Sequence, residues 1–154
     1  MMGNMKHLGK EGINMSDQAL EVIELELAIL IRRLTTATAD NRNLDRASYL
    51  LLRQLSESGP VGVKTLAREL QLDVSTVSRQ AAALAQKKFV EKVRDEADGR
   101  AFFYHITSLG QEELTIYRTA RLASIERLLT DWSGDDTEAF GRLLQQFNRE
   151  LRER

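Results

Sequence analysis

The sequence predicts a mainly α-helical protein with a small β wing, in which a winged helix-turn-helix is flanked by N- and C-terminal dimerisation helices. Three observations lead to this fold class. Residues 65–79 have the pattern of two short helices joined by a tight turn, residues 90–106 have that of a β-hairpin, and long amphipathic segments lie on either side. The 154 residues suffice for one such lobe and a dimerisation module.

The composition argues against several kinds of chemistry. The chain has no cysteine, which rules out disulfides, thiolate nucleophiles, thiol redox sensing and cysteine-containing zinc sites. Its two histidines, His7 and His105, are a poor supply for a metal site or a catalytic dyad. A glycine-rich nucleotide-binding loop is missing as well. We therefore expect no metal, no cofactor and no enzymatic activity.

The N-terminal segment does not have the pattern of a signal peptide. Residues 1–15 are polar, contain several glycines and lack an apolar core, so we expect a flexible tail. No apolar run in the chain is long enough to span a bilayer. These features predict a soluble, cytoplasmic protein.

Residues 16–43 predict a long first helix, with Ser16 as a suitable N-cap. One apolar seam recurs at alternating steps of three and four, and it comprises Leu20, Ile23, Leu27, Leu30 and Leu34. A second apolar stripe lies beside it. A helix that is apolar over so much of its circumference needs more than one neighbour. It is either a core helix of a monomer or a dimerisation helix, and we favour the second.

Residues 44–109 predict the winged lobe. A helix over about 45–58 is stopped by Gly59-Pro60, and residues 61–63 form a short edge strand. Two helices joined at Gln71 and Leu72 come next, and Leu72 is expected to pack in the turn. Their expected buried residues are Leu66, Ala67, Leu70, Val77, Ala81 and Leu84. The turn has Gln71 where a glycine is common, so its backbone conformation must be less comfortable.

The wing is predicted as two strands, over residues 90–94 and 101–106, around an acidic turn. Phe102, Tyr104 and Ile106 alternate along the second strand and share one face, as a half-buried hairpin requires. Residues 110–154 then predict two dimerisation helices that are separated at Ser133-Gly134. Asp135 followed by Glu138 indicates the start of the last helix. One apolar face of this helix comprises Phe140, Leu143, Leu144, Phe147 and Leu151.

The second helix of the helix-turn-helix carries the candidate base-reading residues. A recognition helix presents the residues near its N-terminus to the major groove, and here these are Ser75, Thr76, Ser78, Arg79 and Gln80. Residues 74–89 contain no acid, although the whole chain has a net charge of −1. A DNA-binding protein of such composition must segregate its charge. Taken singly, each hydroxyl could be a cap or turn residue, but the segment as a unit favours contact with DNA.

The wing supplies further candidates in Arg94, Asp98 and Arg100. Asp98, or Asp95, could hold a neighbouring guanidinium in a fixed fork, so that a rigid arginine enters the minor groove. The alternative is a surface hairpin of mixed charge. Residue types alone do not separate the two interpretations.

These motifs together resemble the MarR family. The resemblance lies in Thr65-Leu-Ala, in Val-Ser-Thr-Val-Ser-Arg ending at Arg79, in the wing from Asp95 through Asp98-Gly-Arg100, and in Ile106-Thr-Ser-Leu-Gly110. Lys88 and Ile106 depart from the glycine and the leucine that are usual there. The resemblance implies a homodimer whose terminal helices interlock and whose lobes read a pseudo-palindrome in double-stranded DNA. It also implies roles in DNA binding for Arg79, Asp98 and Arg100.

A regulatory ligand is a further implication of the resemblance. Tyr49, Arg53 and Tyr117 would line a pocket between the lobe and the dimerisation helices, and a small aromatic or phenolic effector would release a repressor from its operator. The competing hypothesis is a winged-helix module that binds protein instead of DNA. An acid-free recognition helix beside a basic wing favours DNA.

Overall fold

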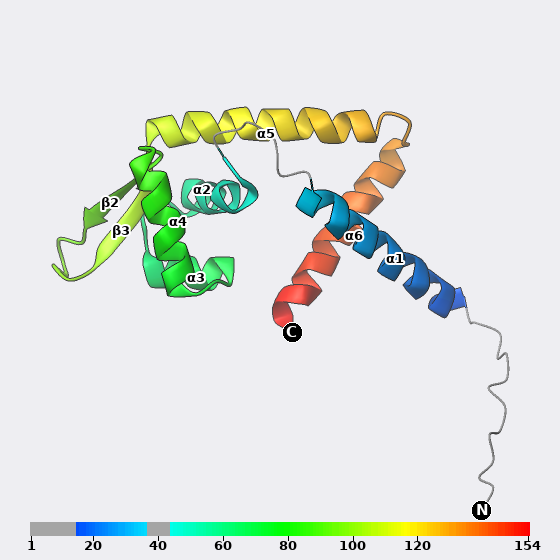
Figure 1. Ribbon diagram of the computed structural model, residues 1–154, viewed down its shortest axis with the longest axis horizontal. Helices are drawn as coiled ribbons and strands as arrows, with labels where there is room; N and C mark the ends of the chain where they lie inside the picture. The colour runs from blue at the N-terminus through cyan, green and yellow to red at the C-terminus, as the bar shows by residue number, and fades with distance from the viewer. Residues whose placement is uncertain (1–14, 37–43) are drawn as a thin grey trace, which may run out of the picture. The chain divides into compact units, whose positions relative to one another are not determined.

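The computed structural model of the protein describes residues 15–36 and 44–154 and confirms the predicted fold class (Figure 1). Helices dominate, and the small sheet is the wing. The chain divides into two compact units, residues 1–41 and 42–154. The predicted tail up to residue 14 lies outside the described residues. The finer division into a lobe and dimerisation helices stays a prediction.

The first unit contains α1 (Met15–Thr36). The helix begins before Ser16, so this residue lies in the first turn and the prediction that it is the N-cap was wrong. Large apolar side chains along the helix are exposed, from Leu20 at 62% to Ile31 at 60%. A helix of this length gains most of its stability from packing on its apolar face.

The second unit begins with three helices that pack around one core: α2 (Arg46–Ser58), α3 (Val63–Leu70) and α4 (Val74–Gln86). Their buried side chains are Leu51, Leu52, Leu55, Leu66, Ala67, Val77, Ala81 and Leu84. The predicted buried faces of α3 and α4 are thus confirmed, with Leu70 partly buried against the same core. The expected packing of Leu72 was wrong, because this side chain is 42% exposed.

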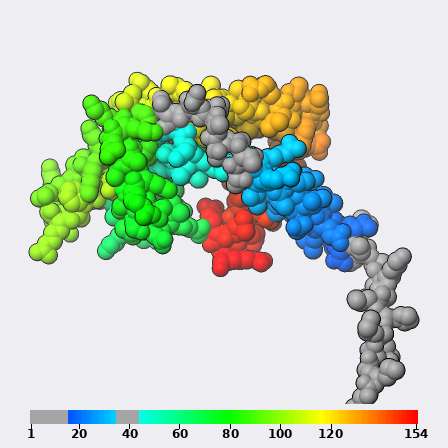
Figure 2. Space-filling model, viewed as in Figure 1, coloured from blue at the N-terminus to red at the C-terminus, as the bar shows by residue number. Residues whose placement is uncertain are grey.

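The sheet is antiparallel with strand order β1-β3-β2. It comprises β1 (Val61–Gly62), β2 (Val90–Arg94) and β3 (Phe102–Ile106), so the predicted edge strand is present and ends one residue early. Val90 pairs with Ile106 and Lys92 with Tyr104. Beyond the core, the hairpin projects as a narrow arm past α3 and α4, as Figure 2 also shows.

Within residues 15–36 and 44–154, two residues other than glycine adopt the left-handed conformation. Gln71 (φ 53°, ψ 45°) ends α3, and Lys88 (φ 63°) joins α4 to the wing. Glycine is the residue that reaches this region without strain. At both positions a glycine is expected from the motif and is absent. The backbone nevertheless adopts the left-handed conformation there, which is strained for a residue with a side chain.

Thr107 and Gly110 fasten the wing to α5 (Ser108–Leu128). The Thr107 hydroxyl donates to the carbonyl of Lys88 at 2.6 Å and accepts from the N–H of Gly110 at 3.0 Å. The Thr107 N–H donates to the carbonyl of Phe89 at 3.0 Å. Gly110 is buried against the same carbonyl. This contact fixes where the recognition helix ends, where the wing begins and where α5 starts.

The last helix, α6 (Gly134–Glu153), is capped by Ser133. The Ser133 hydroxyl accepts from the N–H of Asp136 at 3.1 Å and donates to its carboxylate at 2.8 Å. The predicted capping pair of Asp135 and Glu138 was therefore two residues too late. None of the residues of α6 is buried. Of the helices within residues 15–36 and 44–154, none combines the length and apolarity needed to cross a membrane.

Asp45 makes a pH-dependent contribution to the stability of α2. Its carboxylate accepts from the backbone N–H of Ser48 at 2.7 Å, and this hydrogen bond, aided by Lys87, holds the pKa of Asp45 below its usual value. A carboxyl whose pKa is lower in the folded chain stabilises the fold above its unfolded-state pKa. That contribution is lost as the pH falls through the folded-state pKa.

We therefore expect Asp45→Asn to lower the free energy of unfolding by a few tenths to about 1 kcal/mol at neutral pH. The difference from the parent chain should shrink as the pH falls below about 4. Urea unfolding of both chains at stepped pH measures it. Glu96→Gln, at an exposed position in the wing turn, controls for net charge. A difference that stays constant across this pH range would contradict the assignment.

Candidate nucleic-acid interface

The recognition helix α4 buries one face in the core and leaves the candidate residues around the other. Ser75 and Arg79 are exposed, while Thr76 is half-buried. The Arg79 guanidinium lies 3.4 Å from the Thr76 hydroxyl, so the arginine runs back toward the N-terminus of the helix. Asp73 is the N-cap residue, but its side chain makes no capping hydrogen bond.

The remaining two candidates of α4 lie differently. Ser78 is half-buried and lines a groove between α4, α3 and the wing. Gln80 is also half-buried, and its amide oxygen is buried without a hydrogen-bond partner among the described residues. An unsatisfied buried acceptor is unfavourable. The five residues of the sequence prediction therefore do not form one surface: Ser75, Thr76 and Arg79 lie together, Ser78 faces the groove beside the wing, and the amide oxygen of Gln80 is buried.

The alternation of side chains along the wing strands places their basic and acidic residues on opposite faces. Lys92 and Arg94 pair with Tyr104 and Phe102, so all four side chains share the inner face of the hairpin. The ammonium of Lys92 lies 4.3 Å from the ring centre of Phe102, and the guanidinium of Arg94 lies 5.7 Å from it. Such cation–π contacts restrain long basic side chains. The sequence prediction included Arg94 but missed Lys92, although alternation places both on one face.

The acidic side chain of the wing strands lies on the outer face of the hairpin. Glu91 pairs with His105, and their carboxylate oxygen and Nε2 are 3.0 Å apart. The other ring nitrogen, Nδ1, lies 3.2 Å from the carbonyl of Ile106. Both ring nitrogens therefore have protein partners, and His105 is a structural residue of the strand. Within the described residues, acids and histidines form no cluster of three that could bind a metal.

The wing turn is held by backbone hydrogen bonds to two aspartates. Asp95 accepts from the N–H of Ala97 at 2.9 Å, and Asp98 accepts from the N–H of Arg100 at 3.1 Å. The predicted fork between Asp98 and a guanidinium is thus not what the structure contains. Asp98 orders the loop that presents Arg100, and the guanidinium itself has no ion-pair partner within the described chain.

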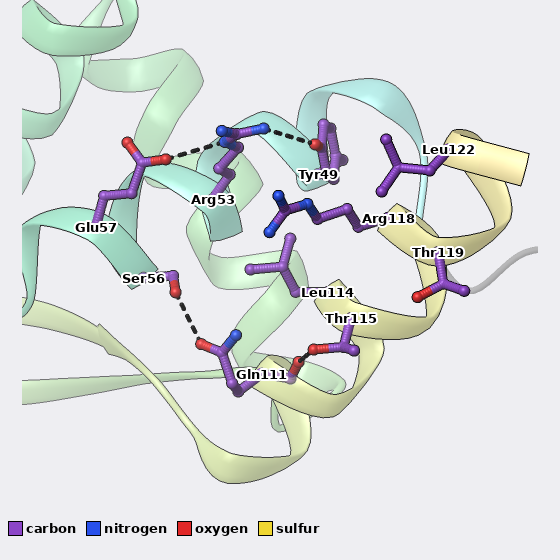
Figure 3. Close-up of a pocket in the computed structure, with 10 residues that line it drawn as sticks. All are labelled: Tyr49, Arg53, Ser56, Glu57, Gln111, Leu114, Thr115, Arg118, Thr119 and Leu122. Atoms are coloured by element: carbon purple, nitrogen blue, oxygen red, sulfur yellow. Dashed lines mark hydrogen bonds and ion pairs between the residues drawn. The ribbon is translucent and has the colours of Figure 1, made fainter. Parts of the chain in front are cut away.

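A separate cavity of about 370 Å³ lies between α2 and α5 (Figure 3). Arg53 donates to the hydroxyl of Tyr49 at 3.2 Å and to the carboxylate of Glu57 at 3.0 Å. These two partners raise the pKa of Arg53 above its usual value, the tyrosine contributing most. Arg118 extends into the same space beside Tyr49.

Of the three residues predicted for this pocket, Tyr49 and Arg53 line it. Tyr117 is not part of the lining but stacks against the Tyr49 ring, with the ring centres 4.8 Å apart. Sequence reasoning missed Arg118, Ser56 and Gln111, of which the last two are joined by a hydrogen bond of 2.8 Å. Only the packing of α2 on α5 brings these residues together.

Known proteins resemble this chain in both sequence and fold. A family model described as the MarR family matches residues 44–102. An uncharacterized HTH-type transcriptional regulator of Bacillus subtilis (strain 168), YxaD, is 46% identical over 133 residues, which cover 84% of this chain and 93% of that protein.

Solved structures share the fold. The transcriptional regulator SlyA has a TM-score of 0.71 at 19% identity, over 85% of this chain and 94% of that one. FabT of Streptococcus pneumoniae, solved in complex with DNA, has a TM-score of 0.65 at 16% identity, over 91% of this chain and 99% of that one.

Proposed function

This chain belongs to the MarR family and is a DNA-binding transcriptional regulator, and on that premise we propose that it is a homodimeric repressor of a pseudo-palindromic operator. A small aromatic or phenolic effector would release it from the DNA. In this proposal it acts in the cytoplasm and catalyses no reaction. The competing hypothesis of a module that binds only protein is not retained, because the relatives are transcriptional regulators.

The observation that best supports this DNA-binding geometry is that positive and negative charges lie on different sides of the lobe. The exposed face of α4 and the inner face of the wing both carry cations, and the acid of strand β2 points to the other side. In this proposal Ser75, Thr76 and Arg79 read bases in the major groove. Arg94 and Arg100 would approach the minor groove, with Asp98 ordering the turn.

Exposed apolar faces support the dimer. Large apolar side chains along α6 are exposed at helical spacing, and they are Phe140, Leu143, Leu144, Phe147 and Leu151. Leu122, Ile125 and Leu128 continue the pattern on the second half of α5. Contiguous apolar surface of this kind marks an association site. In this proposal α1, α5 and α6 pack with the same helices of a second copy.

The cavity between α2 and α5 supports the effector. Two arginines and the Tyr49 hydroxyl face one space, and the only carboxylate in its lining, Glu57, is already paired with Arg53. Such a set suits a small ligand with an aromatic ring and a carboxylate or phenolic oxygen. In this proposal binding there shifts the spacing of the two lobes and so the affinity for DNA.

The test is binding to the DNA immediately upstream of the protein's own gene, across a salt series and against scrambled competitor. We expect a competitor-resistant complex of two chains per site, with a log–log salt slope of about −0.9 per phosphate neutralised. Benzoate and phenol, added in turn, test for release. Binding no tighter than to scrambled DNA, both there and after selection from random duplexes, would overturn the proposal.

A further inference from the structure

A groove of about 440 Å³ lies between the first turn of α3, the side of α4 and the inner face of the wing. We call it the α3–wing groove. The residues that matter here come from all three elements and from the wing turn, and they are Lys64, Thr65, Ser78, Lys92, Arg100 and Phe102. Neither lysine was among the candidate residues of the sequence.

The α3–wing groove carries more positive than negative charge. Three cations line it, from α3, from β2 and from the wing turn, against one carboxylate, Asp98. That carboxylate is bound to the backbone N–H of Arg100 at 3.1 Å. Within the described chain, Lys64 and Lys92 have no carboxylate at ion-pair distance. Cations gathered without counter-charges make a concave surface that attracts an anion.

Lys92 is held in place for such an anion. Its ammonium lies 4.3 Å from the ring centre of Phe102 and 5.9 Å from that of Tyr104, which is buried in the core. The aromatic rings restrain the side chain without neutralising its charge. Thr65 and Ser78 add hydroxyl donors to the same lining.

The position of the α3–wing groove identifies the anion. In a DNA duplex, the sugar-phosphate backbone is the wall that separates the major groove from the minor groove. If α4 enters the major groove and the wing turn reaches the adjacent minor groove, this backbone must cross the surface between α4 and the wing. The α3–wing groove is that surface.

We propose that the α3–wing groove binds the DNA backbone between these two grooves, with Lys64 and Lys92 as phosphate contacts. The inference rests on the proposed placement of α4 and the wing on DNA. The lysines set the affinity and the register of the lobe along the duplex, whereas Arg79 reads sequence. Phosphate contacts carry no base information, so their loss weakens binding to specific and scrambled DNA alike.

The experiment compares Lys64→Gln, Lys92→Gln and the double variant with the parent chain, on the upstream duplex and on a scrambled one. For each occupied groove, a single substitution should weaken both complexes about fivefold at about 0.15 M salt and reduce the magnitude of the log–log salt slope by about 0.9, so the two lobes of a bound dimer together should reduce it by about 1.8. Lys92→Arg should restore the slope. Arg149→Gln, on exposed α6, removes the same charge far along the chain from the lobe and should leave the slope unchanged.

Duplexes with single methylphosphonate linkages then locate the contact. A neutral linkage at the phosphate bound by Lys92 should weaken the parent complex but not weaken the Lys92→Gln complex further. If the parent binds the duplex, but the variants keep its salt slope or lose only sequence discrimination, the inference is wrong while the regulator stands. Failure of the parent itself to bind specifically would count against the proposed function instead.

Discussion

Replacement of Gly110 by alanine is expected to destabilise the lobe by about 3 kcal/mol or more. A Cβ at this position would lie 2.1 Å from the carbonyl oxygen of Phe89 and 2.9 Å from a side-chain carbon of Ile106. The first of these is backbone, so no side-chain rotation relieves the clash. The start of α5 must instead move away from the start of the wing.

That movement breaks the fastening built on Thr107. The hydroxyl bonds to Lys88 and Gly110, and the Thr107 N–H bond to Phe89, all require the present spacing of α5 and the wing. We therefore expect a cooperative loss of stability, measured as a drop of roughly 10 °C in the melting temperature. DNA affinity should fall in parallel, because the wing would no longer be oriented on α4.

Gly134→Ala is the matched control. Gly134 is also in the first turn of a helix, but nothing lies within 4 Å of a Cβ built there. The same substitution should be neutral or slightly stabilising at this site, since alanine is the better helix former. Equal melting temperatures for the parent and the Gly110→Ala chain would show that α5 does not pack on Phe89 as described.

The elements of this fold could be predicted from the sequence because each has a strong local signal. The buried faces of α3 and α4 follow from apolar periodicity, and β3 from its alternation of aromatic residues. The ends were less predictable: Ser133, not Asp135, caps α6, since both residues are good caps and only the path of the chain selects one. The strained backbone at Gln71 and Lys88 could be anticipated from motif positions that usually hold glycine.

The interface was only partly predictable, and the reason is geometric. Arg79 and the wing arginines stand in recognisable motifs. Gln80 belongs to the same segment, yet the rotation of α4 against the core turns its amide oxygen inward. Lys64 lies 28 positions before Lys92, and no periodicity links them until α3 packs beside the wing. Asp98 was assigned the correct loop but the wrong partner, because sequence does not distinguish a bond to a backbone N–H from one to a guanidinium.

Arg79→Ala is expected to weaken specific binding by roughly 5- to 150-fold, the equivalent of about 1–3 kcal/mol for one bidentate base contact. The guanidinium is exposed on the face of α4 that is free of the core, and it carries no ion pair within the described chain. Binding to scrambled DNA should change little. The loss should be confined to one base pair in each half-site, where the variant no longer distinguishes guanine.

Arg79→Lys tests whether base reading needs only the positive charge of Arg79 or also the planar shape of its guanidinium. Lysine keeps the positive charge but lacks the planar fork that matches two acceptors of guanine. We therefore expect it to lose discrimination almost as fully as alanine, with the salt slope of the parent retained in both. Titration against a panel of single-base operator variants measures this. If lysine restores full discrimination, the planar fork is not what reads the base. If alanine weakens binding to scrambled DNA as much as binding to the operator, Arg79 contacts phosphate and the bases are read by Ser75 and Thr76.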